Sequence, residues 1–342
     1  MKVYEIGAQQ GLQSLRASQR PVPQPGPGQV VLRVLAVCLN HRDMLVLNGT
    51  YGPRRAEERV PVSDGVGEVV AVGEGVTDFK RGDRATSGHF VRWLDGAFNP
   101  RFFGHDLGIS HDGWLAEQIL VPADALVPIP DSMSNEQAAV LPAAGLTAWN
   151  ALVEVGRIKA GDLVLALGTG GVSIMALQLA KMHGARVAIT SSSDDKLAMA
   201  RALGADITVN YRTDPDWAAA VVRANGGTGA DIVIETGGLP TLAASIAACA
   251  PNARLALIGA LGQAATDGTP PLANLGGIVG KNLTLRGITA GSRSMLQSMV
   301  KAVAAARVTP VIDKTFAFDE APQAYQHLKS GSHFGKVMIR VA

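Results

Sequence analysis

Hydrophobic and polar residues follow different periods in two parts of this chain. Up to about residue 130, short alternating runs separated by glycine and proline predict a β-rich region, with strands at 30–37, 67–72 and 117–121. From Asn135 onward, apolar strands alternate with helical segments, which is typical of a doubly wound, mainly parallel sheet. Here the predicted strands are 163–167, 186–190, 207–209, 232–235 and 254–258, and the predicted helices are 136–155, 174–182, 196–203, 217–224 and 239–249.

The C-terminal part does not continue this alternation. A helix over 295–306 and a strand over 336–341 follow after about residue 290. A chain of 342 residues is long for one hydrophobic core, so we expect two domains. We assign residues 1–130 and 290–342 to one domain and residues 131–289 to the other.

The segment LVLALGTGGVSIMALQLAK, residues 163–181, is the most informative part of the chain. In it an apolar strand turns through glycines directly into an apolar helix, and another strand follows at the spacing of a βαβ unit. Gly168 allows a tight turn, Gly170 removes a side chain that would block a diphosphate, and the next amides open the helix. The predicted dinucleotide contacts in this turn are Gly168, Thr169, Gly170, Gly171, Val172 and Ser173.

The end of the following strand bears on the choice of dinucleotide. An NAD site carries an acidic residue there, about 20 residues beyond the glycines, that binds the ribose 2′-hydroxyl. In this chain Ser191, Ser192 and Ser193 occupy the place, and Lys196 follows. Hydroxyl groups and an ammonium group bind a 2′-phosphate, so the sequence favours NADP. The adjacent Asp194–Asp195 pair, and the alternative of an ordinary turn, leave NAD open.

Composition narrows the possible partners. The net charge is +2, hydrophobic residues make up 47%, and there is no basic block, so nothing indicates nucleic acid or an anionic membrane surface. No run of about 18 apolar residues free of charge is present, and the start MKVYEIG lacks a basic and apolar leader. Cys38 and Cys249 are the only cysteines, which suits a reducing compartment. We expect a cytoplasmic protein that acts on a small molecule.

Several further motifs accompany the glycine turn: LNHRD at 39–43, GVGEVVAVG at 65–73, FKRGDR at 79–84, LGAD at 203–206, the segment 231–238 and HFGKV at 333–337. Together they resemble the medium-chain dehydrogenase/reductase superfamily, especially its zinc-free, quinone oxidoreductase-like branch. The resemblance implies a GroES-like β-rich catalytic domain built from both chain ends and a central Rossmann domain, with the active site in the cleft between them. It also implies a homodimer or homotetramer, for which the strand-like segment 283–288 is a plausible contact.

Zinc-containing members of this superfamily bind the metal through a cysteine, a histidine, and a further cysteine or acidic residue. The matching positions here hold Asn40, Ser63 and Ala143, and Cys38 lies two residues too early. A catalytic zinc requires about three ligands of the His, Cys or carboxylate type, so we predict no zinc. Without a metal to polarise an alcohol, the favoured reaction is hydride transfer to an electron-poor acceptor, which requires only positioning and a donor for the oxyanion.

Candidate catalytic residues follow from the same resemblance. Arg42 is the first candidate for a polar group near the substrate, with an Arg42–Asp43 ion pair as the alternative. Asn40 offers an amide donor, or else bonds within its loop. Tyr51 is placed to donate to a carbonyl, or simply lines the cleft. His41 is predicted to be packed or exposed rather than a base. The aromatic segment 87–111, with three histidines in no metal-binding spacing, is expected to cover one edge of the substrate cleft.

Further cofactor contacts are implied in the second half of the chain. Thr147 resembles a threonine that touches the nicotinamide, and its alternative role is that of a helix hydroxyl. Lys196 and Tyr211 resemble adenosine-end contacts. Residues at later strand ends, which are where such sheets bind ligands or simply turn, are Thr236, Gly237, Ile258, Gly259 and Ala260. The residues expected to close over the nicotinamide or pyrophosphate are Gly291, Ser292, Arg293 and Lys336, the last with a solvated surface lysine as its alternative.

These observations predict a zinc-independent, NADPH-preferring oxidoreductase that reduces a quinone or an α,β-unsaturated carbonyl compound by direct hydride transfer. Arg42, Tyr51 or a bound water would supply the proton or the oxyanion contact. Two alternatives remain open. One is an NADP-dependent alcohol dehydrogenase or aldehyde reductase, and the other is a non-catalytic NADPH-binding protein.

Overall fold

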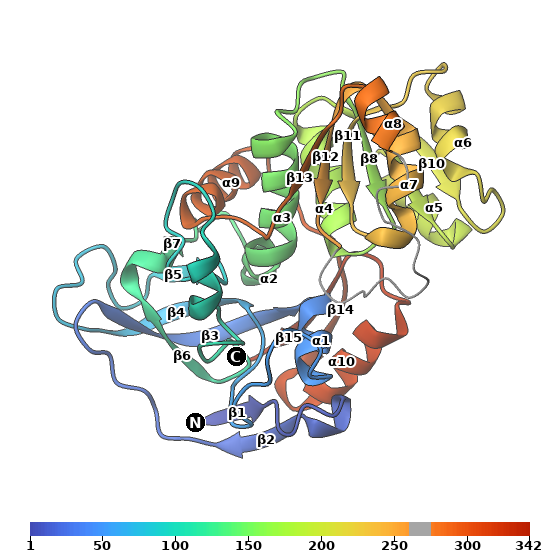
Figure 1. Ribbon diagram of the computed structural model, residues 1–342. Coiled ribbons are helices and arrows are strands. Elements are labelled where there is room, and N and C mark those ends of the chain that lie inside the picture. The colour runs from blue at the N-terminus through green and yellow to red at the C-terminus, as the bar shows by residue number, and fades with distance from the viewer. Residues whose placement is uncertain (260–274) are drawn as a thin grey trace. The chain divides into compact units, whose positions relative to one another are not determined.

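The structure is a computed structural model that describes residues 1–259 and 275–342 (Figure 1). These residues divide into two units, Met1–Leu146 together with Ala290–Ala342, and Thr147–Thr289. Residues 131–146, which the sequence analysis assigned to the Rossmann domain, belong to the first unit. The reason is that helix α2 (Asn135–Val140) packs on strands β3 and β4 of that unit.

The first unit is built on a seven-stranded sheet of order β14-β15-β3-β4-β5-β7, with β6 also paired to β3. Its central strand β3 (Gln29–Leu39) is almost wholly buried, and β15 (Lys336–Arg340) pairs with it in antiparallel register, Val337 opposite Leu39. The C-terminal strand therefore completes the sheet begun by the N-terminal part, as Figure 1 shows by the blue and red strands lying side by side. The expected GroES-like domain made from both chain ends is confirmed.

The remaining strands of this unit are β1 (Lys2–Glu5), β2 (Arg16–Gln19), β4 (Asp64–Val72), β5 (Arg84–Ser87), β6 (Gln118–Pro122), β7 (Leu126–Pro128) and β14 (Ile312–Ala317). Its other helices are α1 (His41–Leu47), α9 (Arg293–Ala305) and α10 (Ala321–Ser330). The hydrophobic pattern did not predict α1, β14 or α10. Helix α1 is only two turns long, and β14 is largely exposed at the end of the sheet, so neither has a strong apolar period.

The second unit contains a six-stranded sheet of order β10-β9-β8-β11-β12-β13 whose strand pairs are all parallel. This is the strand order of a Rossmann sheet. The central strand β8 (Leu163–Leu167) reads LVLAL and is buried along its whole length, because helices cover both faces of such a sheet. The predicted doubly wound fold is confirmed.

The other strands of the second unit are β9 (Arg186–Ser191), β10 (Ile207–Asn210), β11 (Ala230–Glu235), β12 (Cys249–Leu257) and β13 (Thr284–Gly287). Its helices are α4 (Gly171–Met182), α5 (Asp194–Ala202), α6 (Trp217–Ala224), α7 (Leu239–Ala248) and α8 (Leu275–Gly280). Most predicted elements agree with these to within a few residues. The exception is β12, which starts at Cys249 rather than Arg254, with a register shift opposite the start of β11.

The residues around the unit boundary are helical, over Asn135–Val155. This segment includes α2, α3 (Leu146–Trp149) and two stretches of wider, π-type turns at Leu141–Gly145 and Asn150–Val155. Among the described residues it is the one helix long and apolar enough to cross a membrane by length and hydropathy, but 89% of its apolar window is buried inside the protein. Core helices of globular proteins share this character.

Candidate active site

The turn that follows β8 has open space beside it. Gly168 has a φ of +75°, a left-handed conformation that favours glycine. A Cβ atom added at Gly168 or Gly170 would meet no described atom within 4 Å. The hydroxyl of Ser173 donates to the carbonyl of Leu167 at 2.6 Å and holds the first turn of α4 against β8. A helix of 12 residues thus begins at an open glycine turn, which is how helix N-termini bind phosphate groups.

Hydroxyl groups join the ends of the neighbouring strands to this turn. Thr236 Oγ1 donates to the carbonyl of Leu167 at 3.0 Å, and the amide of Gly168 donates to Thr190 Oγ1 at 3.3 Å. Because β9, β8 and β11 are parallel neighbours, their carboxyl ends lie at one edge of the sheet. Thr236, a predicted cofactor contact, therefore lies beside the glycine turn.

A buried carboxylate that the sequence analysis missed shapes the turn after β11. Glu235 accepts hydrogen bonds from the amides of Gly237 at 2.7 Å and Gly238 at 2.9 Å, and from Thr241 Oγ1 at 2.7 Å. The hydroxyl of Ser245 donates to the second oxygen of the same carboxylate. A lone acidic residue that ends an apolar strand just before a Thr-Gly-Gly turn is the sequence signal that would have located it.

The end of β12 approaches the same turn. The amides of Ile258 and Gly259 donate to the carbonyl of Glu235 at 2.9 and 3.2 Å. A Cβ atom on Gly259 would lie 2.1 Å from the carbonyl oxygen of Thr236, so this position requires glycine. Ala260 lies outside the described residues. Ile258 and Gly259 are therefore close to Thr236, and Gly259 has a clear packing role.

The serine run ends β9 and begins α5. Ser193 is the N-cap of α5, and its own amide donates to Ser191 Oγ at 3.3 Å. The amide of Tyr211 donates to the carbonyl of Ser191 at 3.1 Å. Lys196 lies in the first turn of the helix, where Asp194 and Asp195 are exposed. The residues predicted to bind a 2′-phosphate thus lie together at one strand end. Two carboxylates, those of Asp194 and Asp195, lie beside them.

The glycine turn generates a direct prediction. Gly170 has a φ of −79°, which any residue adopts, and open space beside it, so Gly170→Val should leave the thermal midpoint nearly unchanged. The valine side chain would occupy the space assigned to the diphosphate, so NADPH affinity should fall by at least about tenfold, roughly 1.4 kcal/mol. Calorimetric titration with NADPH, alongside thermal unfolding, measures both quantities. Undiminished affinity in a folded variant would show that the diphosphate binds elsewhere.

In the first unit, Arg42 lies in α1 and pairs with a residue distant in sequence. Its Nη2 is 2.5 Å from the carboxylate of Asp106, and its guanidinium lies 5.0 Å from the centre of the Tyr51 ring. Asp43 instead accepts a hydrogen bond from the amide of Asn40 at 2.7 Å, within the capping box of α1. Arg42 therefore pairs with Asp106, and the alternative of an Arg42–Asp43 ion pair is wrong. Asp106, inside the aromatic segment, was missed.

The Arg42 cluster contains buried polar atoms that have no hydrogen-bond partner among the residues that the structure describes. These are Arg42 Nη1, Asp106 Oδ1 and His89 Nδ1. Burial raises the pKa of Asp106 to about 6 against the opposing effect of Arg42. Burial and the positive charge of Arg42 hold the pKa of His89 well below its ordinary value, so this imidazole is neutral. Burial also raises the pKa of Tyr51, so its phenol stays protonated and can donate. Unpaired buried atoms of this kind are often completed by water or a ligand.

A second polar cluster surrounds the end of β3. Lys336, only 4% exposed, donates from Nζ to the carbonyl of Leu39 at 2.7 Å and to Asn40 Oδ1 at 2.5 Å. Asp64, fully buried at the start of β4, faces the same group. Burial is the largest influence on Asp64 and raises its pKa, while Lys336, Ser63 and Asn40 act in the opposite direction. Lys336 is thus a buried lysine that donates to Leu39 and Asn40, and the alternative of a solvated surface lysine is wrong.

The remaining predicted residues have local structural partners. Ser292 is the N-cap of α9, and the guanidinium of Arg293 donates to the carbonyl of Leu126 at 3.1 Å and to Gln297 at 3.0 Å. A Cβ atom on Gly291 would lie 2.8 Å from the side chain of Leu146. Thr147 is buried in α3.

The aromatic segment forms a small core of its own. Phe90, Trp93 and Phe102 are buried against one another, with Phe98 and Met295 packed beside them. The amide of Arg293 donates to the carbonyl of Trp93 at 2.9 Å, which ties the segment to the start of α9. Most of the aromatic surface is therefore used for packing, and the segment's main contribution to the cluster is the pair Asp106 and His89.

Comparison with known proteins accounts for both units. Residues 26–131 match the alcohol dehydrogenase GroES-like domain, and residues 171–305 match the zinc-binding dehydrogenase family. A zinc-type alcohol dehydrogenase-like protein of Schizosaccharomyces pombe is 40% identical over 97% of this chain and 96% of its own. The chain belongs to the medium-chain dehydrogenase/reductase superfamily. It is an oxidoreductase of that family.

Solved structures of the superfamily agree closely with this chain. A Sinorhizobium meliloti protein assigned as an alcohol dehydrogenase has a TM-score of 0.90, with 41% identity and 99% of each chain covered. An NAD-dependent alcohol dehydrogenase has a TM-score of 0.89, with 36% identity and complete coverage of both chains. A mycobacterial protein in complex with NADPH has a TM-score of 0.81 at 27% identity, also with complete coverage. Among sequence relatives, an acryloyl-coenzyme A reductase of Metallosphaera sedula is 29% identical over 93% of each chain.

The name of the zinc-binding dehydrogenase family implies a metal, but the residues present do not fit one. The positions that correspond to zinc ligands, Asn40, Ser63 and Ala143, lie around the Asp64 carboxylate. Ser63 Oγ donates to Asp64 at 2.7 Å and the amide of Ala143 donates at 2.9 Å. Burial raises the pKa of the nearby Cys38 thiol to about 12, so it remains protonated. Within residues 1–259 and 275–342, no group of three His, Cys, Asp or Glu is placed to hold a metal ion.

The charge interaction between Lys336 and Asp64 predicts a large effect of substitution. Lys336→Met removes the ammonium that faces a fully buried carboxylate, which should cost about 3–5 kcal/mol in the free energy of unfolding at neutral pH. Without that ammonium the pKa of Asp64 rises further above its unfolded value. The variant should therefore be most stable in acid and lose stability as the pH rises through this raised pKa. Urea unfolding across a pH series measures the effect.

Two control variants make this test specific. Lys80→Met removes an exposed lysine of the same unit and should change stability by less than about 0.5 kcal/mol. Adding Asp64→Asn to Lys336→Met removes the unpaired charge and should restore much of the lost stability. Equal destabilisation of the single and double variants would show that Lys336 does not compensate Asp64.

Proposed function

We propose that this protein is a zinc-independent, NADPH-preferring reductase that transfers hydride to a quinone or an α,β-unsaturated carbonyl compound. The observation that carries the proposal is the polar cluster at Asp64. The positions that would ligate zinc are a carboxamide, a hydroxyl and a backbone amide, each already bonded within the Asp64–Lys336 cluster. Such a set has no tendency to hold a divalent metal and no means of acidifying an alcohol.

NADPH, when bound, supplies the hydride. The residues of this chain have to hold the cofactor and stabilise the negative charge that develops on the acceptor oxygen. The open turn at Gly168 and Gly170, followed by α4, would bind the diphosphate. The adjacent Thr236 and the end of β12 would limit the space beside it. We assign no step to Lys336, because its ammonium is already bonded to Leu39 and Asn40.

Arg42 and Tyr51 are the residues that we propose to contact the acceptor oxygen. Nη1 of Arg42 has no partner within residues 1–259 and 275–342, while Nη2 binds Asp106, so Arg42 can donate without leaving its ion pair. Tyr51 presents a protonated phenol next to it, held by the cation–π contact. His89, neutral and more deeply buried, is a further donor or acceptor in the same cluster. An enolate or a hydroquinone anion would be stabilised by these donors, and Tyr51 or water would supply the proton.

Relatives support both this reaction and a second candidate. One is named an acryloyl-coenzyme A reductase, and a mycobacterial neighbour is named a quinone oxidoreductase, which favours reduction of an activated acceptor. Several others are named alcohol dehydrogenases, and this makes alcohol oxidation the second candidate. Oxidation of an alcohol requires a group that lowers the pKa of the alcohol, whereas reduction of an activated acceptor does not. The described residues offer no metal site for that purpose, so we rank it second.

The experiment that tests the proposal is an activity assay on metal-free protein. After dialysis against a chelator, NADPH oxidation with a quinone and with an enone should be unchanged, and plasma mass spectrometry should find zinc well below one per chain. Arg42→Met should lower kcat/KM by about 10²–10³-fold, as loss of an oxyanion donor does. Chelator-sensitive turnover with stoichiometric zinc would contradict the proposal. Alcohol-dependent reduction of NADP without reduction of quinones or enones would favour the second candidate, and NADPH binding without any turnover would favour a non-catalytic role.

The preference for NADPH is a separate proposal that rests on the end of β9. Ser191, the last residue of that strand, provides a hydroxyl where a carboxylate would bind a ribose 2′-hydroxyl and repel a 2′-phosphate. One similar structure contains NADPH, and another is named an NAD-dependent alcohol dehydrogenase. The choice between NADPH and NADH therefore has to be argued from this chain's own residues.

Ser191→Asp tests that preference. The new carboxylate should repel the 2′-phosphate and accept the 2′-hydroxyl, which should shift the ratio of NADPH to NADH in kcat/KM by at least about tenfold towards NADH. Ser332→Asp, an exposed serine of the other unit, serves as the control. A wild-type protein that already prefers NADH would contradict the proposal directly.

A further inference from the structure

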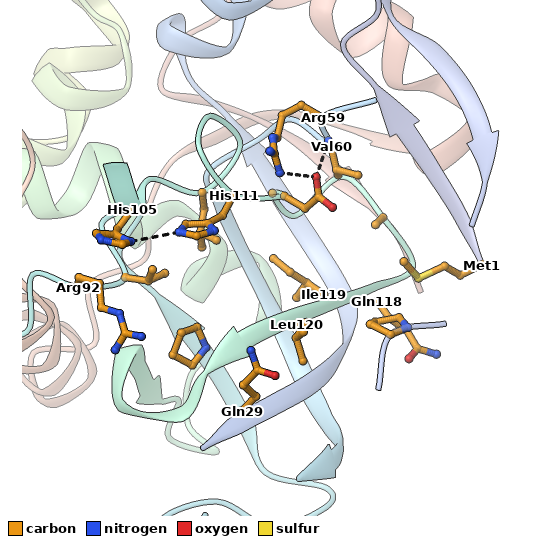
Figure 2. A pocket seen from close by; sticks show the side chains of 17 residues that line it. Met1, Gln29, Arg59, Val60, Arg92, His105, His111, Gln118, Ile119 and Leu120 are labelled. Carbon is orange, nitrogen blue, oxygen red and sulfur yellow. Dashed lines mark hydrogen bonds and ion pairs between the residues drawn. The ribbon is translucent and has the colours of Figure 1, made fainter. Parts of the chain in front are cut away.

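A cavity of about 450 Å³ lies within the first unit, lined by residues of that unit alone (Figure 2). Its volume is in the range of pockets for small molecules. The polar residues of the lining include Arg59, Arg92, His105, His111 and Asp112, together with Gln29 and Gln118, and the apolar residues include Leu120 of β6. The residues that we assign to the reductase site, Arg42, Tyr51 and Asn40, do not line it.

The charge of the lining is predominantly positive. The carboxylate in the lining, Asp112, is neutralised by Arg59 at 2.9 Å and by Arg20 at 3.0 Å, and it also accepts the amide of Val60 at 3.1 Å. Arg92 has only a loose, exposed contact with Asp124 at 3.5 Å. An anion entering the cavity therefore meets cationic groups without a competing free carboxylate in the lining.

The two histidines form a defined pair. His105 Nδ1 lies 3.3 Å from His111 Nε2, and the two rings are nearly parallel, with 16° between their planes. Burial, together with the positive charges of His105, Arg59 and Arg92, lowers the pKa of His111, while Asp112 acts in the opposite direction. A neutral pair that shares one proton has one outer nitrogen free to donate and one free to accept. Protonation, which a bound anion would favour, turns both into donors.

The backbone holds this pair in place. The amide of Gly108 donates to the carbonyl of His111 at 2.9 Å, and the amide of His111 donates to the carbonyl of Asp106 at 3.1 Å. Ser110 Oγ accepts from the amide of Asp106 at 2.6 Å. Because the turn is fixed by these bonds, little conformational entropy would be lost when a ligand binds to the imidazoles.

We propose that this cavity is a binding site for a small organic carboxylate, with the carboxylate at the His105–His111 pair and Arg92 and the apolar part against Leu120. The mixed lining favours such a ligand over inorganic phosphate, which has no apolar part, and over a neutral molecule, which would gain no charge interaction with the cationic side chains of the lining. The site is separate from the proposed reductase chemistry and does not depend on it.

Calorimetric titration of the full-length protein with benzoate tests the proposal. Benzoate should bind more tightly at mildly acidic than at neutral pH, with uptake of a proton that is visible as a dependence of the heat on buffer ionisation. His111→Phe, which keeps a ring but removes both nitrogens, should weaken binding by about tenfold and abolish the proton uptake. Leu120→Trp fills the cavity without removing a charge and should also weaken binding by at least about tenfold.

Controls separate this site from general charge effects. Arg81→Gln removes an exposed arginine of the same unit that does not line the cavity, and should leave benzoate affinity unchanged. Thermal unfolding of each variant confirms that it is folded. Equal benzoate affinity in the wild type, His111→Phe and Leu120→Trp would overturn the proposal. So would binding of inorganic phosphate with at least the affinity of benzoate, or binding of Zn²⁺ at the histidine pair with no response to benzoate.

Discussion

The compensation of one buried charge, that of Asp64, is the constraint on which the first unit depends. A fully buried carboxylate is tolerated only when hydrogen bonds and an opposite charge surround it. Here the groups come from three distant parts of the chain: Ser63 beside it, the amide of Ala143 in the long helix, and Lys336 in the last strand. The pairing of β15 with β3 places the lysine, so sheet topology and charge compensation require each other.

This arrangement also limits the chemistry of the unit. An ammonium group is a fixed monovalent charge, and that of Lys336 donates to Leu39 and Asn40, whereas a metal ion would offer an open coordination position to an alcohol. The nearby donors that remain available are those of the Arg42 cluster, which has unpartnered nitrogen and oxygen atoms in a buried setting. Charge stabilisation of an already electron-poor acceptor is within the reach of such groups.

In the second unit, the proposed cofactor site depends on backbone geometry and not on charged side chains. The turn at Gly168, the hydroxyls of Ser173 and Thr236, and the turn fixed by Glu235 together keep one end of the sheet open and rigid. A dinucleotide needs little more than this from its binding domain, because the helix amides and the empty space beside glycine recognise a diphosphate without a charged side chain.

The sequence by itself determined the features that depend on residues close together in the chain. The strand–turn–helix at 163–182, the alternation of strands and helices, and the missing zinc ligands at Asn40 and Ser63 are all local patterns, and periodicity and spacing are sufficient to read them. Only the tertiary structure decided which distant groups meet. Arg42 pairs with Asp106 rather than with its neighbour Asp43, and Lys336 is buried against Asn40 and faces Asp64. Such pairings depend on sheet register and loop closure across hundreds of residues, and no local propensity encodes them.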